Sequence, residues 1–567
     1  MTGVVGRSIY RHQWLALAVL WLTASVLLMR ELGNAALGYP DADRLLMDGV
    51  FLLDFMRTLP LDRVIEFTKE YYAQYPALSI GYRPPFFPFV EALFNALFGI
   101  NTWSSRLAIL AFALAGISAW YALVARVYDR ETAFWSGALI VTAPFLVQWG
   151  WYTMGEIPLL AMSMITTYYF YRYSESQSAK HLYLTTLLFC LTAWTKQTGV
   201  YLALFFFLYL AYRGQLLDFF KRKQSWLAIV LALVMLAPLA AITLWLGDLN
   251  VQQSVGSAAA SGTPSRFSLA NWLVHFNSLT EYHLTSIVLI LSAAGMVAAV
   301  VQRDRRAIFF GLLIATTYIV FSLLAGKNPR YPFFWIPAFT VFAAVGLFYA
   351  HRPVTRGVLT LALLVAVGYN VFESLRKTPQ FATGYDQAAQ FVLQNSKSPT
   401  VFFDGYNNGY FTYFMRAADP QQSMYVLRAD KLLTSSAINN SIWLEVHAKT
   451  EADIERMLQE YGVELVVLES RDVSGIEIHQ RLRGLVAGDG FQRLASIPVI
   501  SNREPLQQQT LDVYRYLRAK PITAEYLTLK LPVVGQTIKV PMRSLKKTIQ
   551  PGAARTAYSP SYQAVPK

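Results

Sequence analysis

Cysteine and charge are both scarce in this chain. Of its 567 residues one is a cysteine, Cys190, and 15% are charged, whereas a soluble globular protein is about one quarter charged. A single cysteine excludes an internal disulfide and a metal site built from several thiolates. The low charge excludes a purely soluble composition for the whole chain.

Apolar and aromatic residues are correspondingly frequent. Hydrophobic residues make up 54% of the chain and aromatic residues 14%, a composition typical of membrane proteins whose Trp and Tyr line the interfaces. The net charge of +14 is interpreted as the excess of Lys and Arg in cytoplasmic loops, not as nucleic-acid binding. No G-x-G-x-x-G occurs, so the sequence gives no support to a nucleotide site.

The apolar runs predict a polytopic α-helical membrane protein. A spanning helix needs roughly 20 largely apolar residues, and about eleven segments approach this length. Segment 84–100, "PPFFPFVEALFNALFGI", is short, opens with Pro-Pro and carries Glu91, so it is the ambiguous one. The expected spans are 13–30, 104–126, 133–151, 157–172, 181–196, 198–212, 225–246, 284–301, 306–325, 331–350 and 356–372.

Loop charge decides the predicted topology. If segment 84–100 lies along the membrane surface, the loops "RVYDRE", "YRGQLLDFFKRKQ", "VQRDRR" and "HRPVTR" all fall on one side. These loops are rich in Arg and Lys, so this side is expected to be cytoplasmic, with the N-terminus. The first external loop, 31–103, then belongs to a membrane domain covering 1–375, and the C-terminal part of the chain lies outside the cytoplasm.

The composition changes after about residue 376. "TVFFDGYN", "VELVVLES" and "TLDVYRYL" are typical of strands, and "TEADIERMLQEYG" and "IEIHQRLRGLVA" of amphipathic helices. Strands alternating with helices predict an extracytoplasmic α/β domain over 376–520. The basic tail, 521–567, contains "AEYLTLKLPVVGQTIKVPM", which alternates as a hairpin does, and its end is expected to be disordered.

Charged residues recur at the outer ends of the expected spans. Any one of them would serve as an interface anchor or a solvated loop charge. As a set they suit a reaction between an anionic lipid and a hydroxyl, because Lys and Arg bind phosphate and a carboxylate accepts a proton. Asp48 is expected to be solvated instead. The candidate residues are Asp41, Asp43, Arg83, Glu156, Lys196, Lys327 and Arg330.

The order of these motifs resembles that in the C-type (GT-C) glycosyltransferase superfamily. The similarity is to its protein mannosyltransferase-like and lipid A aminoarabinose transferase-like branch, and it covers roughly residues 10–350. The resemblance implies a GT-C-like fold and transfer of a sugar from a polyprenyl-phosphate donor outside the cytoplasm. The motifs that carry it are "YPDADR", "YRPPFFPFVEALFNALFG", "MGEIPLLAMSMITTYYFYR", "LTAWTKQTGVYLAL" and "KNPRYPFFWIPAF".

The resemblance also implies roles for the candidate residues. Asp41 matches the first acid of a pair, and the second acid, adjacent in relatives, is displaced to Asp43, so the identity of the general base stays open between them. Glu156 matches the acid of the second loop, and Arg83 stands where Lys is common. Lys196, Lys327 and Arg330 match the basic positions that would bind the donor phosphate. Such enzymes mostly work without a metal, although two acidic loops could hold a divalent ion.

Two other classes of function remain open from the sequence. A transporter or flippase of polyprenyl-linked glycans would place its polar residues near the midplane, on broken helices. A non-catalytic receptor would leave the recurring outer charges unexplained. The sequence therefore favours a hexosyl or pentosyl transferase in the plasma (inner) membrane. Its expected partners are a polyprenyl-phosphate sugar, membrane lipids and a lipid, protein or glycan acceptor.

Overall fold

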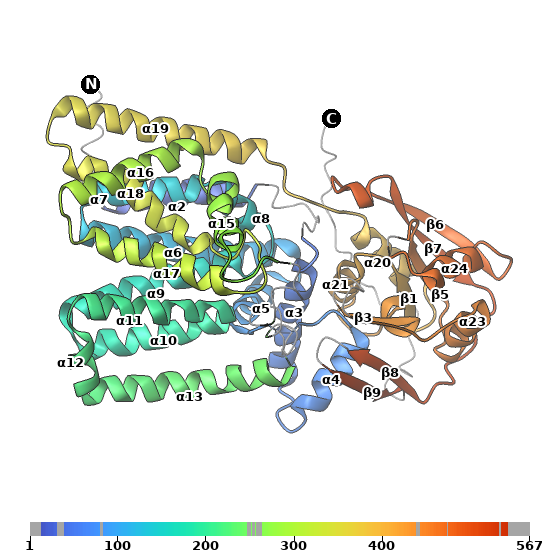
Figure 1. The fold of residues 1–567 in the computed structure, drawn as a ribbon. Helices are drawn as coiled ribbons and strands as arrows, with labels where there is room; N and C mark the ends of the chain where they lie inside the picture. The colour runs from blue at the N-terminus through green and yellow to red at the C-terminus, as the bar shows by residue number, and fades with distance from the viewer. Residues whose placement is uncertain are drawn as a thin grey trace. The chain divides into compact units, whose positions relative to one another are not determined.

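The computed structural model describes residues 13–30, 39–79, 83–246, 251, 256, 263–437, 443–472, 474–531 and 535–542. The chain forms two compact units. One, called the helical unit here, contains residues 1–30, 81–87 and 106–379, and the other, called the mixed unit, contains 31–80, 88–105 and 380–567. Figure 1 shows long helices in the first and a sheet with flanking helices in the second.

Apolar helices make up the helical unit. Every expected span coincides with one of these helices or with two consecutive ones, with ends displaced by a few residues. The helices are α2 (Gln13–Leu28), α6 (Thr102–Val127), α7 (Arg130–Thr142), α8 (Pro144–Trp151), α9 (Glu156–Ser176), α10 (Ala179–Thr195), η1 (Gln197–Tyr201), α11 (Leu202–Tyr212), α12 (Leu216–Lys221), α13 (Lys223–Leu246), α15 (Leu269–Ser278), η3 (Leu279–His283), α16 (Ser286–Val301), α17 (Ala307–Leu323), η4 (Phe333–Trp335), α18 (Ile336–Tyr349) and α19 (Pro353–Arg376).

Helix length separates clear membrane spans from shorter apolar helices. By length and composition α6, α13 and α19 are each able to cross a membrane, and α7 with α8 forms a fourth candidate bent by 54°. The bend falls at Pro144, which cannot continue the hydrogen bonding of α7. Helix α5 (Phe86–Phe98) has 13 residues and is about 20 Å long, too short for a hydrocarbon core of about 30 Å. The total of about eleven spans stays a prediction.

Small residues let the helices of this unit approach closely. A Cβ at Gly116 of α6 would overlap Ala161 of α9, and a Cβ at Gly295 of α16 would overlap the Phe342 carbonyl of α18. Glycine and alanine are favoured at such crossings because backbones can then make direct van der Waals contact. The helical unit is therefore tightly packed where α6 crosses α9 and where α16 crosses α18.

A five-stranded sheet forms the centre of the mixed unit. Its order is β2-β1-β5-β7-β6, with β2, β1 and β5 parallel and β7 and β6 antiparallel to their neighbours. The hairpin expected in the tail is confirmed as β8 paired with β9. The strands are β1 (Thr400–Asp404), β2 (Tyr425–Arg428), β3 (Thr434–Ala437), β4 (Trp443–Val446), β5 (Leu465–Glu469), β6 (Phe491–Val499), β7 (Gln509–Tyr516), β8 (Tyr526–Leu531) and β9 (Gln536–Pro541).

Both faces of this sheet are covered by helices. Every residue of β1 and β5 is buried, as expected for parallel strands between two helical layers. Phe403 and Val467 face one apolar core with α20 (Tyr385–Asn395) and α21 (Asn408–Ala418), while Phe402 and Val466 face the other with α23 (Glu451–Glu460) and α24 (Glu477–Val486). The predicted α/β domain is thus present.

Most of the first external loop is part of this same unit, namely residues 31–80 and 88–103. Helices α3 (Ala42–Thr58) and α4 (Val64–Gln74) contribute Val50, Phe51 and Tyr71 to the core that covers Phe403. The compact units thus differ from the expected division into 1–375 and 376–520, in which this loop was grouped with the membrane helices. The reason is long-range packing of α3 and α4 on the sheet domain, which no local pattern encodes. The chain end from 543 lies outside the described residues.

Candidate functional site

A buried carboxylate and two cations meet in the helical unit. Glu156 is the first residue of α9 and is 1% exposed. Lys196 directly follows α10, and Arg330 lies in the loop between α17 and η4. The three side chains therefore come from three distant parts of the sequence and meet where their helices begin or end.

Glu156 binds both cations through one oxygen. Its Oε1 accepts a hydrogen bond from Lys196 Nζ at 2.7 Å and lies 3.8 Å from Arg330 Nε. Its second oxygen, Oε2, is buried without a hydrogen-bond partner among the residues that the structure describes. An ionised carboxylate is stable in such a place only beside cations, so Glu156 and its two partners form one coupled group.

Aromatic rings and a third cation surround this group. The guanidinium of Arg330 lies 5.7 Å from the ring centre of Trp149 and 5.8 Å from that of Tyr331, and the ammonium of Lys196 lies 5.9 Å from Tyr331. Arg83 is close enough to act electrostatically on both Glu156 and Lys196. The contributions of Trp149 and Tyr331 were not predicted; the adjacency of Arg330 and Tyr331 in "NPRYP" is the signal that could have identified Tyr331.

Positive charge exceeds negative charge in this cluster. Among the described residues whose contacts define the cluster, Arg83, Lys196 and Arg330 carry three positive charges and Glu156 carries one negative charge. Such a surplus in a largely buried site favours an anion, and Arg and Lys are the side chains that bind phosphate. The cluster of Arg83, Glu156, Lys196 and Arg330, called the cationic cluster below, is thus suited to a phosphate group.

Lys327 has a different set of contacts from the other predicted cations. Its Nζ donates to the carbonyl oxygens of Ser322 and Leu324 at 2.6 Å each, and to that of Phe321 at 3.4 Å. These carbonyls lie at the C-terminus of α17, where a cation compensates the helix dipole. The structure therefore gives Lys327 a capping role that the sequence pattern did not distinguish from phosphate binding.

The acidic pair lies in the mixed unit, at the start of α3. Asp41 is the N-cap and is half-buried, whereas Asp43, in the first turn, is 5% exposed. Burial raises the pKa of Asp43 to about 6, with a smaller contribution from the negative charge of Asp41 and opposing effects of Arg44 and Arg428. A Cβ at Gly409 of α21 would overlap the Asp43 carboxylate, so the glycine makes room for this acid.

The expectation for Asp48 is wrong. Asp48 is fully buried and accepts a hydrogen bond from Ser79 N at 2.7 Å and another from the Ser79 hydroxyl. Nearly all residues of α3 between Ala42 and Asp54 are buried, and Asp48 is among them. Its role is to tie α3 to the chain at Ser79.

The polar turn after β1 is satisfied within the fold. Asp404 accepts from Arg483 at 2.7 Å and lies 2.8 Å from His479 Nδ1. These contacts hold α24 against the sheet, so they account for Asp404 without a ligand. The expectation that acidic loops could hold a divalent metal concerns residues of both units and stays a prediction.

Comparison with known proteins connects this fold to one superfamily. Residues 82–242 match the family model described as dolichyl-phosphate-mannose-protein mannosyltransferase. No curated protein has a significant match to the sequence. Among solved structures, ArnT from Cupriavidus metallidurans bound to undecaprenyl phosphate has a TM-score of 0.54 at 14% identity, covering 86% of this chain and 98% of ArnT.

A second solved structure also has a similar fold. The arabinofuranosyltransferase AftD from Mycobacteria has a TM-score of 0.50 at 13% identity, over 91% of this chain and 41% of that one. Both proteins are C-type glycosyltransferases, and at such low identity the likeness concerns the fold. The resemblance stated from the sequence is therefore confirmed, and what the chain shares with these structures at this level of identity is their fold.

Proposed function

We propose that the protein is a glycosyltransferase that moves a hexose or pentose from a polyprenyl-phosphate donor to an acceptor hydroxyl outside the cytoplasm. The observation that carries the proposal is the contact of Lys196 and Arg330 with buried Glu156, which leaves a surplus of positive charge at the ends of apolar helices. The similar structure of ArnT contains undecaprenyl phosphate, a ligand of this chemical class.

The cationic cluster would hold the donor phosphate. Arg83, Lys196 and Arg330 would bind its oxygens and stabilise the negative charge that develops on the phosphate as the sugar departs. Glu156 is a positioning residue in this proposal. Its Oε1 orients Lys196 through a hydrogen bond of 2.7 Å and attracts Arg330, whose Nε lies 3.8 Å away. Lys327 is left out because its ammonium caps α17.

The acidic pair would serve the acceptor. The acceptor oxygen forms a bond to the anomeric carbon as the bond from that carbon to the phosphate oxygen breaks, and the electron pair stays with the polyprenyl phosphate. Asp41 takes the acceptor's proton, because it is half-buried whereas Asp43 is closed in by α21. Direct displacement of this kind inverts the anomeric centre.

Donor consumption tests the proposal. The purified full chain is incubated with polyprenyl-phosphate hexoses and pentoses, with lipid, peptide and glycan acceptors, and the release of polyprenyl phosphate is followed by mass spectrometry. One donor is expected to be consumed by the parent protein and by Lys180→Met, which removes an exposed lysine as a control, but far more slowly by Lys196→Met. If no donor is consumed while the reconstituted protein moves polyprenyl-linked glycans across vesicles, the protein is a transporter.

A further inference from the structure

A long groove in the helical unit is separate from the cationic cluster. It has a volume of about 1070 Å³ and lies between α16, α17 and α18. Its walls are apolar along most of their length, with Met296, Ile308, Ile314 and Phe339 among the lining residues. Gly311 also lines it, and a Cβ added there would meet no atom within 4 Å, so the groove is open in the middle.

One end of the groove carries charge. Arg303, Asp304 and Arg305 line it between α16 and α17. The Asp304 carboxylate accepts hydrogen bonds from Arg306 at 2.9 Å and from the Tyr349 hydroxyl at 2.7 Å, so its charge is compensated. Arg303 and Arg305 are exposed, and no ion pair to either is found in the described part of the chain. This end thus presents two arginines to a ligand.

The opposite end of the groove is aromatic. The rings of Tyr318 and Trp335 are stacked, with centroids 6.0 Å apart and planes inclined by 21°. Their polar atoms are used elsewhere: the Tyr318 hydroxyl donates to the Trp272 carbonyl at 2.8 Å, and Trp335 Nε1 to His283 Nδ1 at 2.9 Å. This end offers ring faces to a hydrocarbon chain and no charge to a headgroup.

The depth of the groove matches one leaflet of a bilayer. Ala307 and Tyr318, which line its two ends, are eleven residues apart on α17, or about 16 Å along the helix. Half of a hydrocarbon core is about 15 Å thick. A lipid with its phosphate at the two arginines would therefore have room for an acyl chain as far as the aromatic end.

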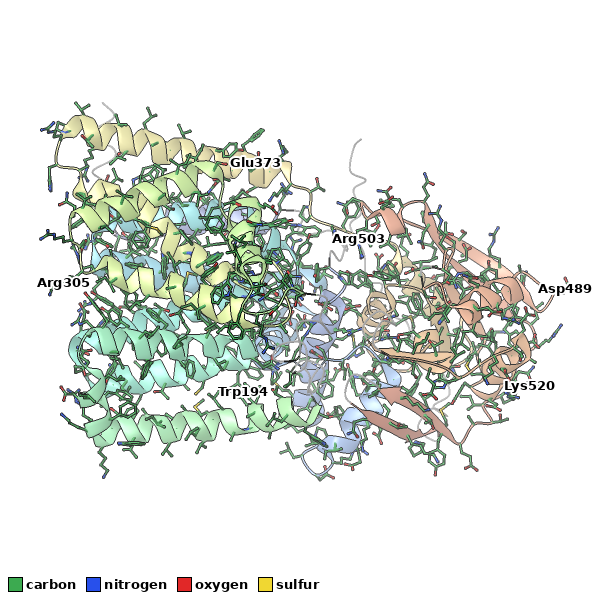
Figure 2. All side chains as sticks on the ribbon, viewed as in Figure 1. Trp194, Arg305, Glu373, Asp489, Arg503 and Lys520 are labelled. Atoms are coloured by element: carbon green, nitrogen blue, oxygen red, sulfur yellow. The ribbon has the colours of Figure 1, made fainter. Side chains whose placement is uncertain are left out.

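We propose that this groove binds an anionic glycerophospholipid, with its phosphate at Arg303 and Arg305. The two arginines belong to the loop "VQRDRR", which the charge pattern assigns to the cytoplasmic side, where anionic lipids are concentrated. Figure 2 shows Arg305 at one end of the helical unit and Trp194, two residues before Lys196, at the other. The proposed donor, whose phosphate belongs with Lys196, therefore has the wrong orientation for this groove, and the inference is independent of the proposed function.

Lipid binding to the purified full chain tests the inference. Native mass spectrometry compares the dissociation constants of phosphatidylglycerol and phosphatidylcholine with identical acyl chains. The parent is expected to prefer phosphatidylglycerol. One basic residue near an anionic lipid strengthens binding about fivefold, so Arg303→Gln/Arg305→Gln should lose about 25-fold in affinity for phosphatidylglycerol and little for phosphatidylcholine. The control Arg130→Gln/Arg352→Gln removes two exposed arginines that do not line the groove and should behave as the parent.

A second variant tests the groove itself. Gly311→Leu adds a side chain where the structure has open space, so it should weaken both lipids at least fivefold while keeping the parental thermal midpoint. The inference is overturned if the parent binds both lipids equally, if the arginine variant keeps its preference, or if Gly311→Leu binds as the parent does. Displacement of phosphatidylglycerol by equimolar undecaprenyl phosphate would also overturn it, because the groove would then belong to the donor.

Discussion

Replacing Asp43 by Asn should stabilise the protein at neutral pH. The pKa of Asp43 is raised from 3.8 to about 6, chiefly by burial, so between these values the folded state holds a proton that the unfolded chain has lost. Stability therefore falls as the pH rises from about 4 to 6 and stays reduced above that. Raising the pKa by about two corresponds to a loss of about 3 kcal/mol in the free energy of unfolding above pH 6. Asp43→Asn removes this loss because its amide carries no charge.

Thermal unfolding at several pH values measures this effect. The midpoint of Asp43→Asn should exceed that of the parent by several degrees at pH 8, and the difference should shrink towards zero at pH 4. Asp62→Asn, which replaces an exposed acid in the same external segment, is the control and should follow the parent at both pH values. A difference for Asp43→Asn that does not change with pH, or that is negative at pH 8, would refute the assignment of a raised pKa.

Three further predictions concern the mixed unit. Asp41→Asn should lower turnover at least a hundredfold in the donor-consumption assay while donor binding is kept, since a general base is typically worth a hundred- to ten-thousandfold; near-parental turnover would show that Asp41 is not the base. Gly409→Ala should displace the Asp43 carboxylate, and the difference in thermal midpoint between pH 4 and pH 8 should change from the parent's; an unchanged difference would contradict the packing described. Arg416→Met leaves Asp54, now paired with Arg416 at 2.6 Å and 2% exposed, as an unpaired buried charge. The free energy of unfolding, measured with a chemical denaturant, should therefore fall by about 3–5 kcal/mol, a loss that a surface pair would not show.

Most helices and several strands could be predicted from the local distribution of apolar and polar residues. The apolar segment 104–126 predicted α6, and "VELVVLES" predicted β5, because an uninterrupted apolar stretch is compatible with few other structures. Strand β2, with four residues, and β6, with intermediate or exposed residues over much of its length, carry too little pattern to be seen. Local periodicity also predicted the β8–β9 hairpin, whose pairing is short-range.

Tertiary partners could not be read in the same way. The sequence singled out Glu156, Lys196 and Arg330 as charges near apolar ends, but their contact depends on how α9, α10 and the loop after α17 pack. The same limit explains Asp48, whose partner Ser79 is 31 residues away, and Lys327, whose carbonyl partners belong to the end of α17. Composition identified which charges were unusual, and packing decided which of them meet.

Donor affinity is the property that depends most closely on the cationic cluster. The ligand is the polyprenyl-phosphate sugar that the donor-consumption assay identifies. Its equilibrium binding is measured for the parent, Lys196→Met, Arg330→Met and the control Lys180→Met, each checked for a parental thermal midpoint. Loss of a hydrogen bond to a charged group costs about 1.5–3 kcal/mol. The dissociation constants of Lys196→Met and Arg330→Met should therefore rise about ten- to a hundredfold, and that of Lys180→Met should be unchanged. Parental affinity in both Lys196→Met and Arg330→Met would contradict the assignment of the cationic cluster to the donor phosphate.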